Sequence, residues 1–116
     1  MMRLAAKCKS ALISALAASI AVAPAIAETI FVKYRGTVDL APFRCEWIEN
    51  SSLVRRLCYD RKNEYLIVSL NGTYYHYCGL PAAVLKDWVS APSLGRFYNA
   101  TIKHNFDCRQ KLPPAY

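Results

Sequence analysis

The sequence lacks an apolar run long enough to cross a membrane. Its most apolar stretch, Ala11 to Val22, is rich in alanine. It is shorter than the span of about 20 residues that a membrane-crossing helix needs. An uncleaved membrane anchor is therefore the less favoured interpretation of this segment. The first part of the chain also lacks acidic residues, because none precedes Glu28.

What the N-terminal segment does contain is the order of features found in signal peptides. Basic residues come first, at Arg3, Lys7 and Lys9, and the short apolar stretch follows. Pro24 then precedes Ala25-Ile26-Ala27, a small-x-small triplet of the kind that signal peptidase cleaves. We expect residues 1–27 to be a signal peptide, removed after Ala27. The Ala-x-Ala style is typical of bacteria and predicts a periplasmic or secreted protein.

The sequence also lacks the paired C-x2-4-C spacing that is typical of zinc sites. Four of the five cysteines follow the predicted cleavage site, and gaps of 12, 19 and 29 residues separate them. An even number of widely spaced cysteines in a small exported chain favours two disulfides over a metal site. These cysteines are Cys45, Cys58, Cys78 and Cys108. We expect neither a metal nor another cofactor.

No constellation of catalytic residues is visible. The two histidines, His76 and His104, have no nucleophile or carboxylate at a spacing that would mark a triad or an acid–base pair. A structural role is the more favoured interpretation of both. Asp60 lies in a polar stretch and is more simply explained as a turn residue.

Neither an internal repeat nor a linker divides the chain, so one domain remains after cleavage. Removing residues 1–27 from the 116 leaves 89, near the size at which disulfides usefully supplement a limited core. Cleavage also lowers the formal charge from +7 to +4, because the removed segment carries three basic residues and no acidic one. A moderately basic surface is compatible with anionic lipid, wall polymer or nucleic acid, but it identifies none of them.

The residue pattern predicts an α+β domain. Residues 28–50 form an N-terminal extended arm or strand, and strands follow at 53–59, 65–70 and 73–78. Apolar residues at helical spacing predict one helix after Pro81 and a second from Ser93 to about His104. We therefore expect a small three-stranded antiparallel meander followed by two helices packed on one face. Residues 109–116 are expected to be a flexible tail.

The Asn71-Gly72 pair sets the register of this meander, since both residues tolerate the positive φ of a type I′ hairpin turn. Leu70 then lies opposite Thr73, and Leu66 lies opposite Tyr77. Cys58 and Cys78 would lie on strands that are not neighbours, about 9.5 Å apart. A disulfide needs Cα atoms within about 7 Å, so we expect each of these cysteines to pair with Cys45 or Cys108 instead.

Residues 51–106 resemble the KTSC domain family. The resemblance rests on Tyr59-Asp60, the strand that ends in Asn71-Gly72, Tyr75-x-Tyr77, and Ser93-x-Gly95-Arg96-Phe97-Tyr98-Asn99, in the family order. We place a KTSC-like domain at 51–108. The family is named for a domain at the C-terminus of some lysyl-tRNA synthetases and also occurs as small stand-alone proteins. Its biochemical role is poorly defined, so the resemblance implies a fold more than a function.

Several residues of this segment are candidates for ligand binding. The domain is rich in tyrosine with arginines among them, and such surfaces suit nucleic acid, sugar rings or peptides; core packing is the simpler alternative. Ser93 precedes a predicted helix, where it could help to hold an anion or could only cap the helix. The candidates are Tyr59, Asp60, Tyr75, Tyr77, Ser93, Arg96 and Asn99.

Three functional hypotheses follow from these patterns. The leading one is a non-enzymatic periplasmic binding or interaction module, with an envelope protein or an anionic polymer as its partner. The second is a small envelope enzyme that uses a site around Tyr59, Asp60, Arg96 and Asn99. The third is a module that binds nucleic acid through a basic Tyr/Arg surface.

Overall fold

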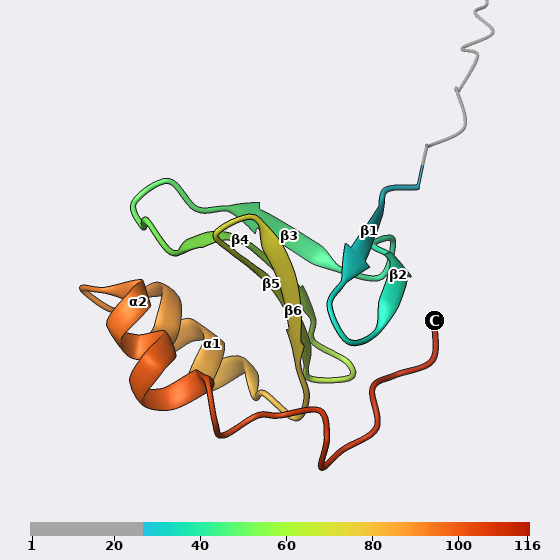
Figure 1. Cartoon of the computed structure of the whole chain (residues 1–116). Helices are drawn as coiled ribbons and strands as arrows, with labels where there is room; N and C mark the ends of the chain where they lie inside the picture. The colour runs from blue at the N-terminus through green and yellow to red at the C-terminus, as the bar shows by residue number, and fades with distance from the viewer. Residues whose placement is uncertain (1–26) are drawn as a thin grey trace, which may run out of the picture.

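A computed structural model describes residues 27–116 of the chain, and the predicted signal peptide, apart from Ala27, lies outside the described residues. The described part contains a mixed six-stranded sheet with the strand order β2-β1-β6-β5-β4-β3. The strands are β1 (Thr29–Val32), β2 (Gly36–Asp39), β3 (Arg44–Trp47), β4 (Val54–Asp60), β5 (Tyr65–Leu70) and β6 (Thr73–Tyr77). The helices are α1 (Ala82–Val89), α2 (Leu94–Phe97) and a π-helical turn, Tyr98–Ile102. Figure 1 shows the helices on one side of the curled sheet and the β1–β2 hairpin on the other.

The central meander of β4, β5 and β6 is the part that the residue pattern predicts well. Asn71 and Gly72 have φ values of 52° and 90° and form the expected turn. Leu70 pairs with Thr73, and Leu66 pairs with Tyr77. The predicted hairpin register is therefore confirmed, because a two-residue turn of this type fixes which residues lie opposite each other.

The predicted fold as a whole, a three-stranded meander with two helices, is wrong. The segment predicted as a single arm or strand forms three strands, of which β1 and β2 make a hairpin and β3 pairs with β4. The hairpin turns where Tyr34 and Gly36 have φ values of 71° and 108°. Gly36 interrupts the apolar run, but a tyrosine rarely adopts positive φ, so the residue pattern alone did not predict a hairpin turn here. The second helix, expected from Ser93 to about His104, consists of the four residues of α2 and a π-helical turn that follows directly and ends at Ile102.

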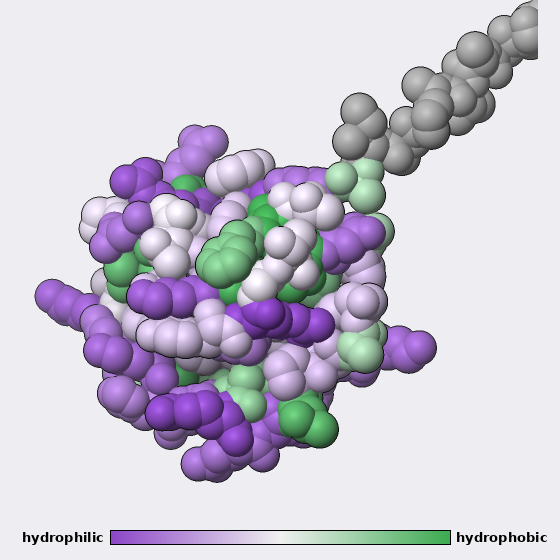
Figure 2. All heavy atoms as spheres, turned by 45° about the vertical axis from the view of Figure 1, so that its right-hand side comes forward, coloured by the Kyte–Doolittle hydropathy of each residue, from purple (hydrophilic) through white to green (hydrophobic). Residues whose placement is uncertain are grey.

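Both faces of the sheet are covered, each by a different part of the chain. On one face, Leu57, Leu66 and Val68 pack with Trp88 and Ile102 of the helical layer. On the other, the β1–β2 hairpin brings its own apolar residues against the sheet. This second core comprises Val32, Val38, Leu40, Cys58, Tyr65, Ile67 and Cys78. Figure 2 shows a mostly polar outer surface in which apolar side chains form small, separate patches.

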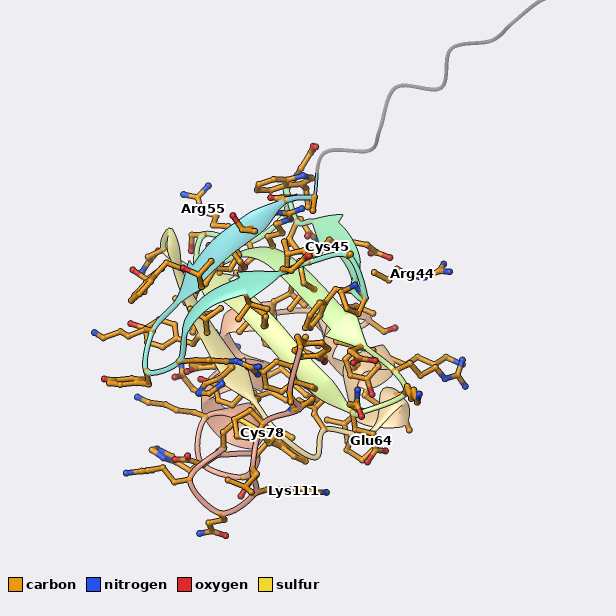
Figure 3. All side chains as sticks on the ribbon, turned by 90° about the vertical axis from the view of Figure 1, so that its right-hand side faces the viewer. Arg44, Cys45, Arg55, Glu64, Cys78 and Lys111 are labelled. Atoms are coloured by element: carbon orange, nitrogen blue, oxygen red, sulfur yellow. A yellow bond between two sulfur atoms is a disulfide. The ribbon has the colours of Figure 1, made fainter. Side chains whose placement is uncertain are left out.

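Two disulfides cross-link this arrangement. Cys45 of β3 pairs with Cys58, which lies directly opposite it on β4. Cys78, just after β6, pairs with Cys108 in the C-terminal segment. The prediction that Cys58 and Cys78 bond to Cys45 or Cys108, and not to each other, is confirmed. Figure 3 shows Cys45 and Cys78 at well-separated places on the ribbon.

The C-terminal segment crosses from the helical layer to the hairpin side of the sheet (Figure 1). Arg35 of the hairpin turn donates a hydrogen bond to the carbonyl oxygen of Pro114, with an N–O distance of 2.6 Å. The ring of Tyr116 packs against Phe43 and Tyr65, and its hydroxyl donates to Asp60. The segment expected to be a flexible tail thus has contacts at its very end. Among residues 27–116, no helix has the length and apolar character to cross a membrane.

Candidate binding clefts

The first cleft lies beside β6, and we call it the β6 cleft. Its volume is about 580 Å³, within the usual range of ligand pockets. Four separate segments build it: the β1–β2 turn, strand β6, the residue after the π-helical turn, and the C-terminal segment. Its lining residues are Tyr34, Tyr75, His76, Tyr77, Lys103, Asp107, Cys108, Arg109 and Pro113.

Tyrosine rings and cations dominate the mouth of the β6 cleft. Tyr34 is 81% exposed. The Lys33 ammonium lies 5.4 Å from the ring centroid of Tyr34 and 5.8 Å from that of Tyr75. Lys103, directly after the π-helical turn, and Arg109, in the C-terminal segment, are also exposed. Arg109 pairs with Asp107 at 2.5 Å, whereas Lys33 and Lys103 form no ion pair with a carboxylate among residues 27–116. The mouth is therefore cationic and aromatic.

His76 holds a defined hydrogen-bonding state in this cleft. Burial and the nearby Arg35 guanidinium lower the pKa of His76, and Asp107 only partly opposes them, so the ring is neutral at neutral pH. Its Nδ1 lies 2.7 Å from the Tyr65 hydroxyl, and burial raises the pKa of that hydroxyl. We assign the Tyr65 hydroxyl as donor to Nδ1, which leaves the ring hydrogen of His76 on Nε2 as a donor.

The second cavity lies between β3 and α1, and we call it the β3 groove. Its volume is about 720 Å³. Two of the predicted site residues, Tyr59 and Asp60, border it. The Tyr59 hydroxyl donates to the carbonyl oxygen of Leu80 at 2.7 Å, and burial raises its pKa. This ring therefore acts as a core residue.

Asp60 organises the turn after β4. Its Oδ1 accepts the backbone N–H of Lys62 at 3.1 Å, and its Oδ2 accepts the side-chain amide of Asn63 at 2.7 Å. Burial pushes the pKa of Asp60 upward, but the hydrogen bonds from Tyr116, Asn63 and Lys62 outweigh it and hold the pKa below its ordinary value. Both oxygens are thus engaged by the protein itself.

The remaining predicted site residues divide between the core, the β6 cleft and the surface. Tyr77 lines the β6 cleft but is buried, and its hydroxyl lies 2.5 Å from that of Tyr98. Ser93 accepts the backbone N–H of Arg96 at 3.2 Å, as a helix cap does. Arg96 and Asn99 are exposed and border neither cavity. The structure therefore places Tyr75 and Tyr77 at the β6 cleft, and Tyr59 and Asp60 at the β3 groove. The other three candidates border neither cavity.

The sequence interpretation missed Tyr34, Lys103, Asp107 and Arg109 of the β6 cleft. Asp107 and Arg109 flank Cys108, so the disulfide to Cys78 brings them to the end of β6. The spacing of the cysteines did not decide whether Cys78 bonds to Cys45 or to Cys108. The sequence therefore did not predict that Asp107 and Arg109 lie near the end of β6. Tyr34 lies in the hairpin turn, which was not predicted.

The family comparison agrees with the resemblance found in the sequence. Residues 50–106 match the model of the KTSC domain. No functionally curated protein matches the chain. Among solved structures, the chain is similar to a KTSC domain protein from Yersinia pestis, with a TM-score of 0.52 and 29% sequence identity. That similarity covers 56% of this chain and 92% of the other.

The matched segment contains β4, β5, β6, both short helices and the π-helical turn, whereas β1, β2, β3 and the last ten residues lie outside it. Residues 50–106 of this chain thus belong to the KTSC domain family, a family without an assigned molecular role.

Proposed function

We propose that this protein is an exported, non-enzymatic binding module whose β6 cleft holds an anionic polymer of the cell envelope. The observation that carries the proposal is the combination of the exposed Tyr34 ring and the half-buried Tyr75 ring with lysine and arginine around one open cleft. Sugar rings stack on tyrosine faces, and carboxylate or phosphate groups pair with lysine and arginine. The Nε2–H of His76 adds a neutral donor to the same cleft.

The state of the acidic and basic groups favours binding over catalysis. A general base needs a free lone pair within reach of the substrate. In this cleft the Nδ1 of His76 is engaged with Tyr65. The Asp107 carboxylate is engaged with Arg109, through the side chain and through the backbone N–H. Both groups therefore hold their neighbours in place.

Two features support export as part of this proposal. The first is the order of signal-peptide features in residues 1–27. The second is the pair of disulfides, because such bonds persist in the periplasm and outside the cell but are rare in the reducing cytosol. An anionic envelope polymer would be within reach of a protein in either place.

The proposal is tested by titrating the purified, oxidised protein with polygalacturonate, a carboxylated polysaccharide, and with uncharged dextran. We expect saturable binding to polygalacturonate alone, weakened about tenfold in Lys33→Gln/Lys103→Gln, since two exposed charge pairs contribute up to about 1 kcal/mol each. The matched control, Arg55→Gln/Arg96→Gln, removes the same charge away from the cleft and should lose no more than about twofold.

Equal losses of affinity in both double variants would show that binding depends only on net charge. That result would contradict specific binding in the β6 cleft. Tighter binding of a single-stranded oligonucleotide than of polygalacturonate would favour the nucleic-acid hypothesis instead. Steep dependence on salt would accompany either polyanion, so salt dependence by itself does not decide between them.

A further inference from the structure

The β3 groove is a second concave surface, separate from the β6 cleft. Strand β3 and the adjoining part of β4 form one wall and floor, and α1 forms the other wall. Its lining residues are Pro42, Arg44, Glu46, Leu57, Tyr59, Asp60, Arg61, Lys62, Ala82, Leu85, Lys86 and Val89. The two cavities share no lining residue.

The groove exists because β3 extends the sheet beyond the helical layer. Strand β3 is at the edge of the sheet and lies outside the segment that matches the family. Cys45 packs on the hairpin side, together with Cys58. Since neighbouring residues of a strand point to opposite faces, Arg44 and Glu46 lie on the helical side, where they border the groove. The Cys45–Cys58 disulfide thus fixes the position of one groove wall.

The groove combines an apolar floor with a basic rim. Leu57 and Leu85 contribute apolar surface, and Val89, at the end of α1, is 43% exposed. Four basic residues border the groove: Arg44, Arg61, Lys62 and Lys86. Of its two acidic residues, Asp60 has both oxygens occupied by hydrogen bonds. Glu46 is the other acid, so positive charge prevails around the rim.

We propose that the β3 groove binds an acidic segment of a partner protein, with carboxylates at the basic rim and an apolar side chain on the Leu57–Leu85–Val89 floor. A flat bilayer does not fit a concave groove. Single-stranded nucleic acid is typically bound by stacking its bases on exposed rings, and the ring that borders the groove, Tyr59, is buried. The chain's own N-terminal segment carries Arg3, Lys7 and Lys9 and no acid, so its charge has the wrong sign.

The test uses the oxidised, isotope-labelled protein and a short synthetic peptide that alternates Glu with Val. We expect saturable shifts of the backbone amides of β3 and α1. Affinity should fall about tenfold in Arg44→Gln/Lys86→Gln, which removes two exposed charges from opposite walls. The same Arg55→Gln/Arg96→Gln control should lose no more than about twofold. Figure 3 shows Arg44 and Arg55 at opposite margins of the molecule, which makes this control informative.

A second variant, Val89→Asn, separates the apolar floor from the rim, because it removes an apolar side chain without changing the charge. The position is already exposed, so we expect the fold to persist and the peptide to bind about tenfold more weakly. Three outcomes would overturn the proposal: equal binding of a Lys/Val peptide, shifts centred on Lys103 and Arg109 instead of β3, or tighter binding to anionic lipid vesicles than to the peptide.

Discussion

At the scale of single residues, most of the tyrosines that suggested a binding surface serve the core. The Tyr59 hydroxyl donates a hydrogen bond to a backbone carbonyl, and the hydroxyls of Tyr77 and Tyr98 are hydrogen-bonded across the sheet–helix interface. Tyr77 and Tyr98 are both buried. Burial raises the pKa of Tyr77, and the hydrogen bond to Tyr98 raises it further, so the Tyr77 hydroxyl keeps its proton.

We expect Tyr77→Phe and Tyr98→Phe each to lower the free energy of unfolding by about 1–2 kcal/mol, because each leaves the other hydroxyl without its partner. The double variant should lose less than the sum of the two, since no orphaned hydroxyl then remains. Urea unfolding of the four proteins gives the coupling. Strict additivity would show that the two hydroxyls do not interact.

The ion pair between Glu28 and Arg56 is a second residue-scale feature. Two hydrogen bonds, of 2.6 and 2.9 Å, join the Glu28 carboxylate to the Arg56 guanidinium. Arg56 is 6% exposed and also lies over the Trp47 ring. These hydrogen bonds lower the pKa of Glu28 from its ordinary value of 4.5. Glu28 is also the residue that follows the predicted cleavage site.

A carboxylate whose pKa is lowered by folding stabilises the folded state above its unfolded pKa, and that contribution is lost as the pH falls through the folded pKa. We therefore expect Glu28→Gln to be less stable than the wild type at neutral pH and equally stable once the pH is well below 4.5. Unfolding measured across this pH range provides the check. Glu49→Gln, which removes the same charge at an exposed position, is the control.

At the scale of elements, the residue pattern predicted the central strands of the sheet but not the strands at its edges. The Asn71-Gly72 turn predicted the β5–β6 register because a two-residue loop permits only one pairing of the strands around it. The β1–β2 hairpin depends on a positive φ at Tyr34. Tyrosine rarely adopts this conformation, so its presence in the sequence does not predict a turn. The β6 cleft was only half predictable, since Tyr75 and Tyr77 follow from strand alternation but Lys103, Asp107 and Arg109 depend on the tertiary path of the chain.

The two disulfides should have separable effects, because each holds a different cavity. The bonded cysteines are 13 residues apart in Cys45–Cys58 and 30 apart in Cys78–Cys108. Loop-closure entropy gives a loss of about 2.9 kcal/mol for Cys45→Ser/Cys58→Ser and about 3.6 kcal/mol for Cys78→Ser/Cys108→Ser. Denaturant unfolding would measure both losses.

We expect the Cys78→Ser/Cys108→Ser variant to lose polygalacturonate binding and the Cys45→Ser/Cys58→Ser variant to lose binding of the acidic peptide. Each variant should keep the other activity, provided that it remains folded under the conditions of the titration. Parallel loss of both activities in two folded variants would show that the cavities are not independent.

At the scale of the whole molecule, the segments on either side of the KTSC domain help to cover the second face of the sheet. Each disulfide joins one cysteine within residues 50–106 to one outside them. The hairpin, β3 and the C-terminal segment contribute residues to the second core and one wall of each cavity. Disulfides of this kind form in an oxidising compartment, so the two disulfides agree with the predicted export.

The measurement that tests this account most directly is the intact mass and the disulfide map of the protein recovered from the periplasm of a bacterial host. We predict a chain that begins at Glu28, has no free thiol, and contains the bonds Cys45–Cys58 and Cys78–Cys108. A protein that remains in the cytoplasm with residues 1–27 attached and its cysteines reduced would contradict the account.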